Sequence, residues 1–160
     1  MYKSIVVVII MSILSCQSPQ GNQIPEFEYK SMDGNVVSEE DLRGKATVIC
    51  VWATWCGDCI REIPELNALA KKYEGNNKVS FLAFSDEDEA TVRKSLNKFP
   101  FNFTHIVDSK AYSDKLKTGL VKHFPQVLVV DDNLNIVFEV TENKQKIFIT
   151  LDNHIQDIIK

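Results

Sequence analysis

Residues 46–59 read ATVICVWATWCGDC and indicate both the fold and the chemistry. Residues 46–52 are a continuous apolar run rich in β-branched side chains, which is typical of a strand buried on both faces. Cys56 and Cys59 follow this run, are separated by two residues, and open a helix. Unpaired N–H groups and the helix dipole lower the pKa of a cysteine at a helix N-terminus. The pattern therefore predicts a redox-active pair in which Cys56 is the nucleophile.

The residues around the two cysteines are expected to tune them. Trp55 would cover one side of the pair, and Gly57 would give the turn conformational freedom. Asp58 has two interpretations, because a carboxylate beside a thiolate raises the thiol pKa, whereas a solvated acid at a helix N-terminus only favours the helix. The two-residue spacing lets the sulfur of Cys59 approach from the first helical turn, so a disulfide can close with little backbone motion.

Hydrophobic periodicity outside this centre predicts alternating strands and helices. Strands are expected over residues 27–31, 36–37, 46–52, 79–84, 101–107, 127–130 and 136–140. Helices are expected from the C-x-x-C pair to residue 73, from 86–88 to 99, over 113–123 and at the C-terminus, with a short capped turn from Ser38 to Asp41. This order predicts an α/β sandwich around one mixed sheet.

Residues 24–66 resemble the TlpA-like branch of the thioredoxin superfamily, and the similarity continues to the terminal helix. The motifs that carry it are Asp33-Gly34, Leu42-Arg43-Gly44-Lys45, the 52–59 stretch, and Glu62 with Pro64-Glu65-Leu66. The resemblance implies a thioredoxin fold, with a central mixed β-sheet flanked by helices, an N-terminal β-hairpin and an inserted β-α element before a cis-proline. Pro125 matches that cis-proline, which in the family lies against the redox pair and helps bind an extended substrate. The implied activity is thiol–disulfide oxidoreduction without a bound cofactor or metal.

Three further positions bear on the chemistry. Cys50 stands where thioredoxins carry a buried acid, and we expect it to be only a small buried apolar side chain. Glu62, one helical turn after Cys59, is then the candidate for proton transfer, and family members in cytochrome c maturation carry a functional glutamate at this position. The alternative for Glu62 is an exposed carboxylate of the first helical turn. Phe124 beside Pro125 either narrows the substrate groove or belongs to the core.

The N-terminus resembles the export signal of a bacterial lipoprotein. Lys3 precedes an apolar stretch over residues 5–14, which is too short to span a bilayer as a stable helix. Leu14-Ser15-Cys16 resembles a lipobox, in which the chain is cut before a cysteine that receives lipid. We expect a signal peptide over 1–15, a lipidated tether over 16–24 and a thioredoxin-like domain over 25–160. An uncleaved anchor and a plain secretory signal are the alternatives.

These features place the protein in the extracytoplasmic cell envelope, on the periplasmic side and lipid-anchored to a membrane. Gln17 lacks the aspartate associated with inner-membrane retention, which favours the outer membrane where the host has one. An exported location lets disulfides persist, so a lone C-x-x-C pair favours redox chemistry over half a zinc site.

Composition and spacing count against several other functions. The net charge is −4 at pH 7 and no basic patch interleaves with aromatics, so nucleic-acid binding is not expected. His105, His123 and His154 lack a Cys–His metal spacing and are expected to be surface or locally hydrogen-bonded residues. Residues 85–89, SDEDE, lack the glycine and spacing of a calcium loop and are interpreted as a solvated helix start.

The favoured function is reduction of disulfides in envelope proteins by dithiol–disulfide exchange, with a membrane thiol reductant as electron donor. One alternative is a disulfide-forming oxidase, which a reduction potential would distinguish. The other is a Cu(I) metallochaperone that uses Cys56, Cys59 and His123 as ligands. Related copper-binding proteins usually have three residues between their cysteines, which counts against it. A peroxidase is disfavoured, because the one Thr-x-x-Cys spacing, from Thr47 to Cys50, lies inside the apolar run.

Overall fold

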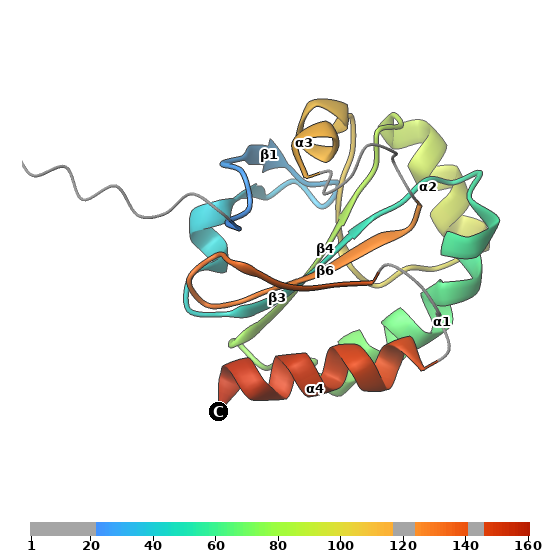
Figure 1. The fold of residues 1–160 in the computed structure, drawn as a ribbon. Coiled ribbons are helices and arrows are strands. Elements are labelled where there is room, and N and C mark those ends of the chain that lie inside the picture. The colour runs from blue at the N-terminus through green and yellow to red at the C-terminus, as the bar shows by residue number, and fades with distance from the viewer. Residues whose placement is uncertain (1–21, 117–123, 141–145) are drawn as a thin grey trace, which may run out of the picture.

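A computed structural model describes residues 22–116, 124–140 and 146–160 (Figure 1). The strands are β1 (Glu28–Lys30), β2 (Val36–Ser38), β3 (Ala46–Val51), β4 (Val79–Phe84), β5 (Thr104–Ile106), β6 (Gln126–Val130) and β7 (Ile136–Val140). The helices are the 3-10 helix η1 (Glu39–Leu42) and the α-helices α1 (Gly57–Lys72), α2 (Glu89–Lys98), α3 (Lys110–Lys115) and α4 (Ile147–Ile159).

The apolar run of the sequence is β3, the central strand of a five-stranded sheet with the order β5-β4-β3-β6-β7. β4 runs parallel to β3 and β5 parallel to β4, whereas β6 is antiparallel to β3 and β7 to β6. All six residues of β3 are buried, as expected for a strand covered on both faces. β1 and β2 form a separate antiparallel pair, so the predicted mixed sheet and N-terminal hairpin are confirmed.

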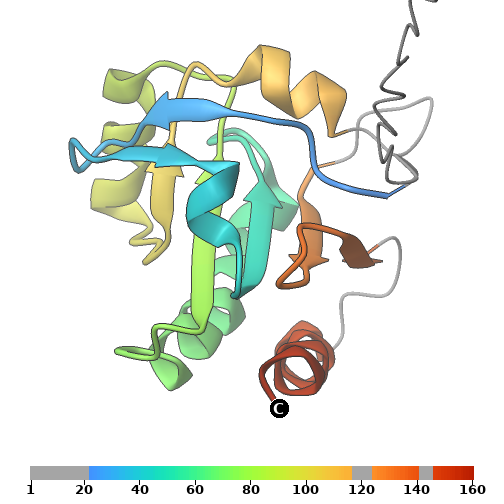
Figure 2. The same cartoon turned by 90° about the vertical axis from the view of Figure 1, so that its left-hand side faces the viewer.

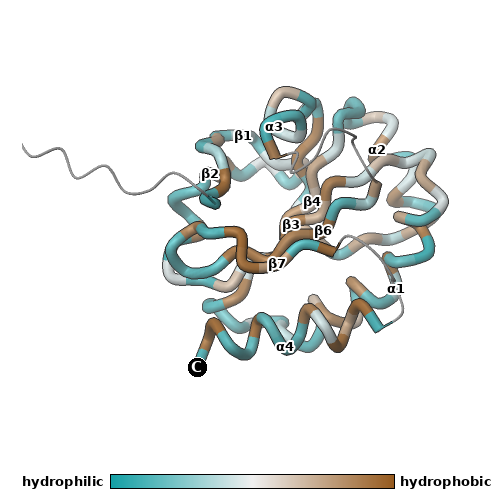
Figure 3. Tube along the Cα trace, viewed as in Figure 1, coloured by the Kyte–Doolittle hydropathy of each residue, from teal (hydrophilic) through white to brown (hydrophobic). Residues whose placement is uncertain are grey.

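Two apolar layers cover the sheet. Val48, Cys50 and Trp52 belong to the cluster shared with α1 and α4, whereas Ile49 and Val51 belong to the cluster shared with the hairpin and α3. Figures 1 and 2 show α1 and α4 on one side of the sheet and the hairpin with α3 on the other. Hydrophobic residues concentrate along the central strands, as Figure 3 shows. The alternation of side chains along a strand therefore builds both halves of the core.

Several element boundaries differ from the prediction. α3 begins at Lys110 rather than residue 113, after the N-cap Ser109, and the expected end of this helix lies outside the described residues. β5 is shorter than the expected 101–107 strand, and Phe101 and Phe103 are buried core residues that precede it. β5 and α3 supply the β-α element expected before Pro125. The capping box is confirmed, since the Ser38 amide donates to Asp41 Oδ2 at 2.8 Å.

Residues before 25 already contact the domain, although the sequence predicted a tether over 16–24 and the start of the domain at residue 25. The Ile24 amide donates to the Leu134 carbonyl at 3.0 Å, and Gln23 forms an isolated bridge with Asn135. Ile24 itself is buried, which makes it part of the fold rather than of a tether. No helix in the described part of the chain has the length and apolar character that crossing a membrane requires. The expected signal peptide and Cys16 lie outside the described residues.

Candidate active site

Cys56 and Cys59 are joined in a disulfide at the N-terminus of α1. Cys56 is the N-cap residue, and its sulfur accepts a hydrogen bond from the Cys59 amide at 3.1 Å. Cys56 is 7% exposed and Cys59 is 3% exposed, which agrees with the order expected for an attacking and a resolving cysteine. The cap position directs unpaired N–H groups toward the Cys56 sulfur, so the reduced thiolate would be stabilised by the helix terminus.

The turn that carries Cys56 is held by the end of the sheet. The Trp52 amide donates to the Phe84 carbonyl at 3.0 Å, which extends the β3–β4 pairing by one residue. The Cys56 amide then donates to the Ala53 carbonyl at 3.1 Å and closes the turn into α1. The pairing of β3 with β4 therefore sets the residue at which the β3–α1 loop begins. The hydrogen bond between Cys56 and Ala53 then sets the position of Cys56 at the start of α1.

Glu62 is buried, with 6% of its surface exposed, which the sequence did not predict. It lies in α1 one turn after Cys59, and Cys50 occupies the same core cluster as the redox pair. Burial, together with the charge of Glu62, raises the pKa of the Cys50 thiol well above its ordinary value. Cys50 is therefore a protonated, buried side chain, and Glu62 is the buried carboxylate whose charge acts on it.

The two residues between the cysteines have modest structural roles. Asp58 is half-buried and pairs with Arg61 on the surface of the first helical turn. Gly57 is the first residue of α1, and a Cβ added there would meet open space. Its backbone does not lie in the left-handed region, so the conformational freedom expected of Gly57 is not required by this turn.

An aromatic pair borders the redox centre. Trp55 is 71% exposed, and its ring meets that of Phe124 edge to face at a centroid distance of 5.5 Å. Phe124 is also packed against both core clusters, in agreement with one of its two alternative roles, whereas narrowing of a substrate groove stays a prediction. The Phe124–Pro125 peptide bond is cis, as the resemblance predicted. Because Gln126 pairs with Val51, Pro125 lies beside the start of the Cys56 loop.

Glu87 is a residue of this region that the sequence did not single out. The 85–89 segment was expected to be a solvated helix start, and Asp88 does cap α2. Glu87, however, is half-buried and accepts hydrogen bonds from the Thr54 amide at 2.7 Å and the Thr54 hydroxyl at 2.6 Å. No signal within the acidic run distinguishes Glu87 from its neighbours, because its partner belongs to a different strand end.

The histidines behave in different ways. His105 is buried, and its Nε2 lies 2.8 Å from the Phe101 carbonyl oxygen, which fits the expected local hydrogen bond. His154 stacks on Phe138, whereas His123 lies outside the described residues. Within the part of the chain that the structure describes, no three His, Cys, Asp or Glu side chains form a group suited to a metal ion.

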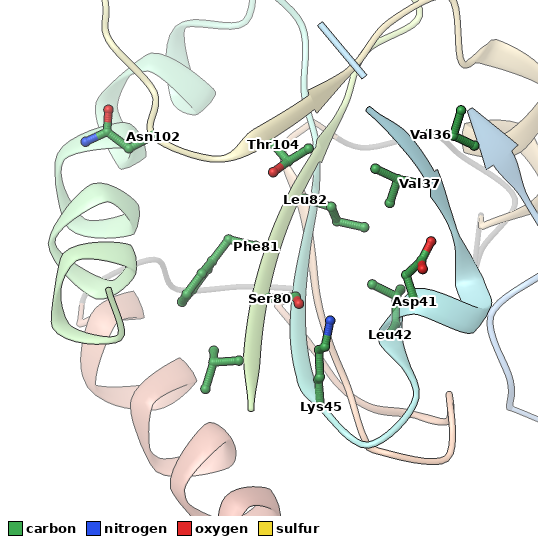
Figure 4. A pocket seen from close by; sticks show the side chains of 11 residues that line it. Val36, Val37, Asp41, Leu42, Lys45, Ser80, Phe81, Leu82, Asn102 and Thr104 are labelled. Atoms are coloured by element: carbon green, nitrogen blue, oxygen red, sulfur yellow. The ribbon is translucent and has the colours of Figure 1, made fainter. Parts of the chain in front are cut away.

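A pocket of about 390 Å³ lies away from the redox pair (Figure 4). Residues of β2, η1, the start of β4 and the segment before β5 line it. Cys56 follows the C-terminal end of β3, and β4 is parallel to β3, so the pocket lies toward the opposite end of the sheet. Chemistry at the cysteines would therefore not use this pocket.

Comparisons with known proteins agree with this geometry. A family model described as the AhpC/TSA family matches residues 20–139. The thioredoxin-like protein YneN of Bacillus subtilis is 28% identical over 115 residues, which cover 71% of this chain and 66% of YneN. The thiol-disulfide oxidoreductase ResA of Geobacillus kaustophilus is 27% identical over 139 residues, which cover 86% of this chain and 77% of ResA. A Chlorobium tepidum structure described as a thiol:disulfide interchange protein DsbE has a TM-score of 0.75 at 25% identity, covering 88% of this chain and 97% of that one.

Proposed function

Because the chain belongs to the AhpC/TSA family, within the TlpA-like branch of the thioredoxin superfamily, we propose that it reduces disulfides of cell-envelope proteins. Its activity is thiol–disulfide oxidoreduction by dithiol–disulfide exchange. The observation that carries the proposal is the Cys56–Cys59 pair at the N-terminus of α1. A helix terminus activates the first cysteine, and the second lies within bonding distance of it.

Acidic side chains near the pair support reduction as the direction of electron flow. Asp58 lies between the cysteines, Glu62 is buried one turn later, and Glu87 reaches the residue two before Cys56. Negative charge near a sulfur disfavours its thiolate and so disfavours the reduced form relative to the disulfide. Strong disulfide-forming oxidases work in the opposite way, because their reduced form is stabilised.

The exchange proceeds in two steps that conserve atoms and electrons. The Cys56 thiolate attacks one sulfur of the substrate disulfide, a bond forms between them, and the other substrate sulfur leaves with the electron pair as a thiolate. Cys59 then loses its proton and attacks Cys56, which closes the enzyme disulfide and releases the second substrate thiol. Two electrons pass from the enzyme to the substrate, and a membrane thiol reductant would restore the dithiol.

Glu62 is proposed to accept the proton of Cys59 in the second step. A thiol behind Cys56 loses its proton slowly without a nearby base, and Cys50 cannot accept that proton because its raised pKa keeps its own thiol protonated. The burial of Glu62 one helical turn from Cys59 supports this assignment. Trp55, Phe124 and Pro125 are proposed to hold an extended substrate segment across the pair, since an exposed aromatic ring offers contact area at low conformational cost.

Trapping substrates tests the function directly. In a Cys59→Ala variant the mixed disulfide on Cys56 cannot be resolved, so disulfide-linked partners should accumulate in the cell envelope and be released by a thiol reductant. A Cys56→Ala/Cys59→Ala double variant is the control and should trap nothing. Equal recovery of partners from both variants would contradict the assignment of Cys56 as nucleophile.

The reduction potential tests the direction. A reductant of thioredoxin type has a potential of about −270 mV, whereas strong oxidases lie near about −120 mV. We expect a value close to the former from equilibration of the purified protein with glutathione. A value near the latter would assign the protein to disulfide formation instead.

A further inference from the structure

The loop between β3 and α1 is tied to the loop after β4 by one carboxylate. Glu87 Oε2 accepts the Thr54 amide at 2.7 Å, and Glu87 Oε1 accepts the Thr54 hydroxyl at 2.6 Å. Thr54 lies two residues before Cys56 and directly before Trp55. Both oxygens of Glu87 are therefore engaged with the segment that presents the nucleophile.

Glu87 is itself fixed by the β-α element that precedes Pro125. The Glu87 amide donates to the Ser85 hydroxyl at 3.2 Å, and the Glu87 carbonyl accepts the Asp108 amide at 3.0 Å. The carbonyl of Ser85, which is fully buried, accepts the amide and the hydroxyl of Ser109, at 3.0 and 2.9 Å. A continuous set of hydrogen bonds thus runs from the β5–α3 connection to Thr54. Because its backbone is held by these hydrogen bonds, the Glu87 carboxylate can fix the position of Thr54.

We propose that Glu87 is a positioning residue that holds the Thr54–Cys56 segment in the geometry from which the Cys56 thiolate attacks a substrate disulfide; this rests on the proposed function. Attack requires the thiolate, the sulfur it bonds to and the departing sulfur to lie in line. Holding reacting groups in such a geometry accounts for a large part of enzymatic rate, and a misplacement of about 1 Å can lower it about a hundredfold. The same two hydrogen bonds would keep the Trp55 ring beside Phe124, the aromatic pair proposed to hold the substrate segment.

The charge of Glu87 and its hydrogen bonds have opposite expected effects on Cys56. The negative charge raises the thiol pKa, so its removal alone would increase the thiolate fraction near neutral pH. Displacement of the Thr54–Cys56 segment would instead lower the rate at which the Cys56 thiolate attacks the substrate disulfide, at any pH. The two are separated by measuring the rate at a pH high enough for Cys56 to be fully ionised.

The experiment compares Glu87→Ala, Glu87→Gln and Glu89→Gln with the wild type. The reaction is reduction of a disulfide-bonded peptide from pH 5 to 10, iodoacetamide labelling gives the Cys56 pKa, and thermal unfolding of the oxidised protein reports stability. We expect the limiting rate at high pH to fall about tenfold in Glu87→Ala, as for loss of hydrogen bonds to a charged acceptor. Glu87→Gln, which keeps one acceptor oxygen for the Thr54 amide, should stay within about threefold of the wild type.

Glu89→Gln is the matched control, because it removes the same charge from the same acidic run. Glu89 is exposed and pairs with Arg93 on the first turn of α2, away from Thr54. A limiting rate in Glu87→Ala equal to that of the wild type would overturn the proposal, whatever the effect on unfolding. So would equal losses in Glu87→Ala and Glu89→Gln, which would show a charge effect only.

A fourth variant covers the case in which Glu87→Ala does not fold. Thr54→Val keeps the side-chain shape and the hydrogen bond from the backbone amide to Glu87, but removes the hydrogen bond from the hydroxyl. It should lower the limiting rate about threefold or more. An unchanged limiting rate in a folded Thr54→Val protein would also count against the proposal. A wild-type protein unable to reduce the peptide would instead refute the proposed function, so the two failures are distinguishable.

Discussion

Cys50 and Glu62 are two buried side chains at the redox centre with different expected roles. The raised pKa of Cys50 keeps its thiol protonated at neutral pH, so it fills space in the core without carrying charge. Glu62 places a carboxylate close enough to influence that thiol. A buried carboxylate one turn from the resolving cysteine can serve as a base even though the position used by thioredoxins is occupied by Cys50.

Glu62→Gln should slow disulfide reduction by about ten- to a hundredfold, the lower range of general acid–base effects. The rate is followed with a model disulfide at several pH values. Because the Glu62 side chain is buried, its replacement can also change stability, so unfolding must be measured beside the rate.

Cys50→Ala should instead lower the free energy of unfolding by about 1 kcal/mol and leave the rate nearly unchanged, as for loss of a small buried side chain. Chemical denaturation of the oxidised protein gives the first quantity and the same disulfide assay the second. If Cys50→Ala reduced the disulfide slowly while Glu62→Gln reduced it at the wild-type rate, proton transfer would be assigned to Cys50 instead of Glu62.

His105 should make stability depend on pH. Burial lowers its pKa, although the contact with the Phe101 carbonyl and the charge of Asp33 oppose the shift. The unfolded chain therefore binds a proton below about pH 6.5 that the folded chain does not, so the free energy of unfolding decreases as the pH falls through that value. His105→Gln, which retains an N–H donor, should flatten the dependence between pH 5 and 7. Parallel curves for the two proteins in denaturant titrations would assign the pH effect to other groups.

At the scale of elements, α4 is attached to α1 at two points. The Glu65 carboxylate of α1 accepts the Phe148 amide at 3.1 Å, and Lys146, the N-cap residue, provides no capping side chain of its own. Near the other end of α1, Asp152 accepts hydrogen bonds from Lys72 at 2.6 Å and from the Tyr73 hydroxyl at 2.7 Å. Side chains of α1 thus supply both the missing cap and the register of α4.

Asp152→Ala should reduce the free energy of unfolding by about 1–2 kcal/mol, because it leaves the half-buried Tyr73 hydroxyl without its acceptor. Asp157→Ala is the control on the same helix, since Asp157 pairs with the exposed Lys160 and its loss should leave unfolding unchanged within error. Equal effects of the two substitutions in urea denaturation would mean that the contact to Tyr73 contributes nothing specific.

At the scale of the whole molecule, the proposed lipid anchor would lie close to the folded domain. Asn22 is the first described residue, and its side chain donates to the Ile136 carbonyl, so at most residues 17–21 would link Cys16 to this contact. Five residues extend at most about 17 Å. A domain held at that distance would act on substrates near the membrane surface.

Intact-mass measurement of protein extracted from membranes should show cleavage after Ser15 and the added mass of acyl chains on Cys16. A Cys16→Ser variant should fail to be processed in this way and should lose its lipid. A variant that is cleaved and held on the membrane like the wild type would exclude lipidation as the means of attachment.

The sequence by itself determined the redox pair, its place between a buried strand and a helix, and the order of the elements. These features depend on residues close in the chain, through the C-x-x-C spacing, the period of apolar side chains and the caps. The cis bond at Pro125 was also predictable, through the resemblance of the surrounding motifs to a known family. Boundaries were less certain, as the start of α3 shows.

Only the tertiary structure decided which polar side chains meet at the candidate site and which are buried there. Thr54 and Glu87 are 33 positions apart and meet because β3 and β4 are parallel neighbours whose C-terminal ends lie together. The burial of Glu62 and of His105 depends in the same way on what packs against them. An acidic residue looks alike in sequence whether it is solvated or caps a catalytic loop, because the partner that distinguishes the two cases comes from a distant strand.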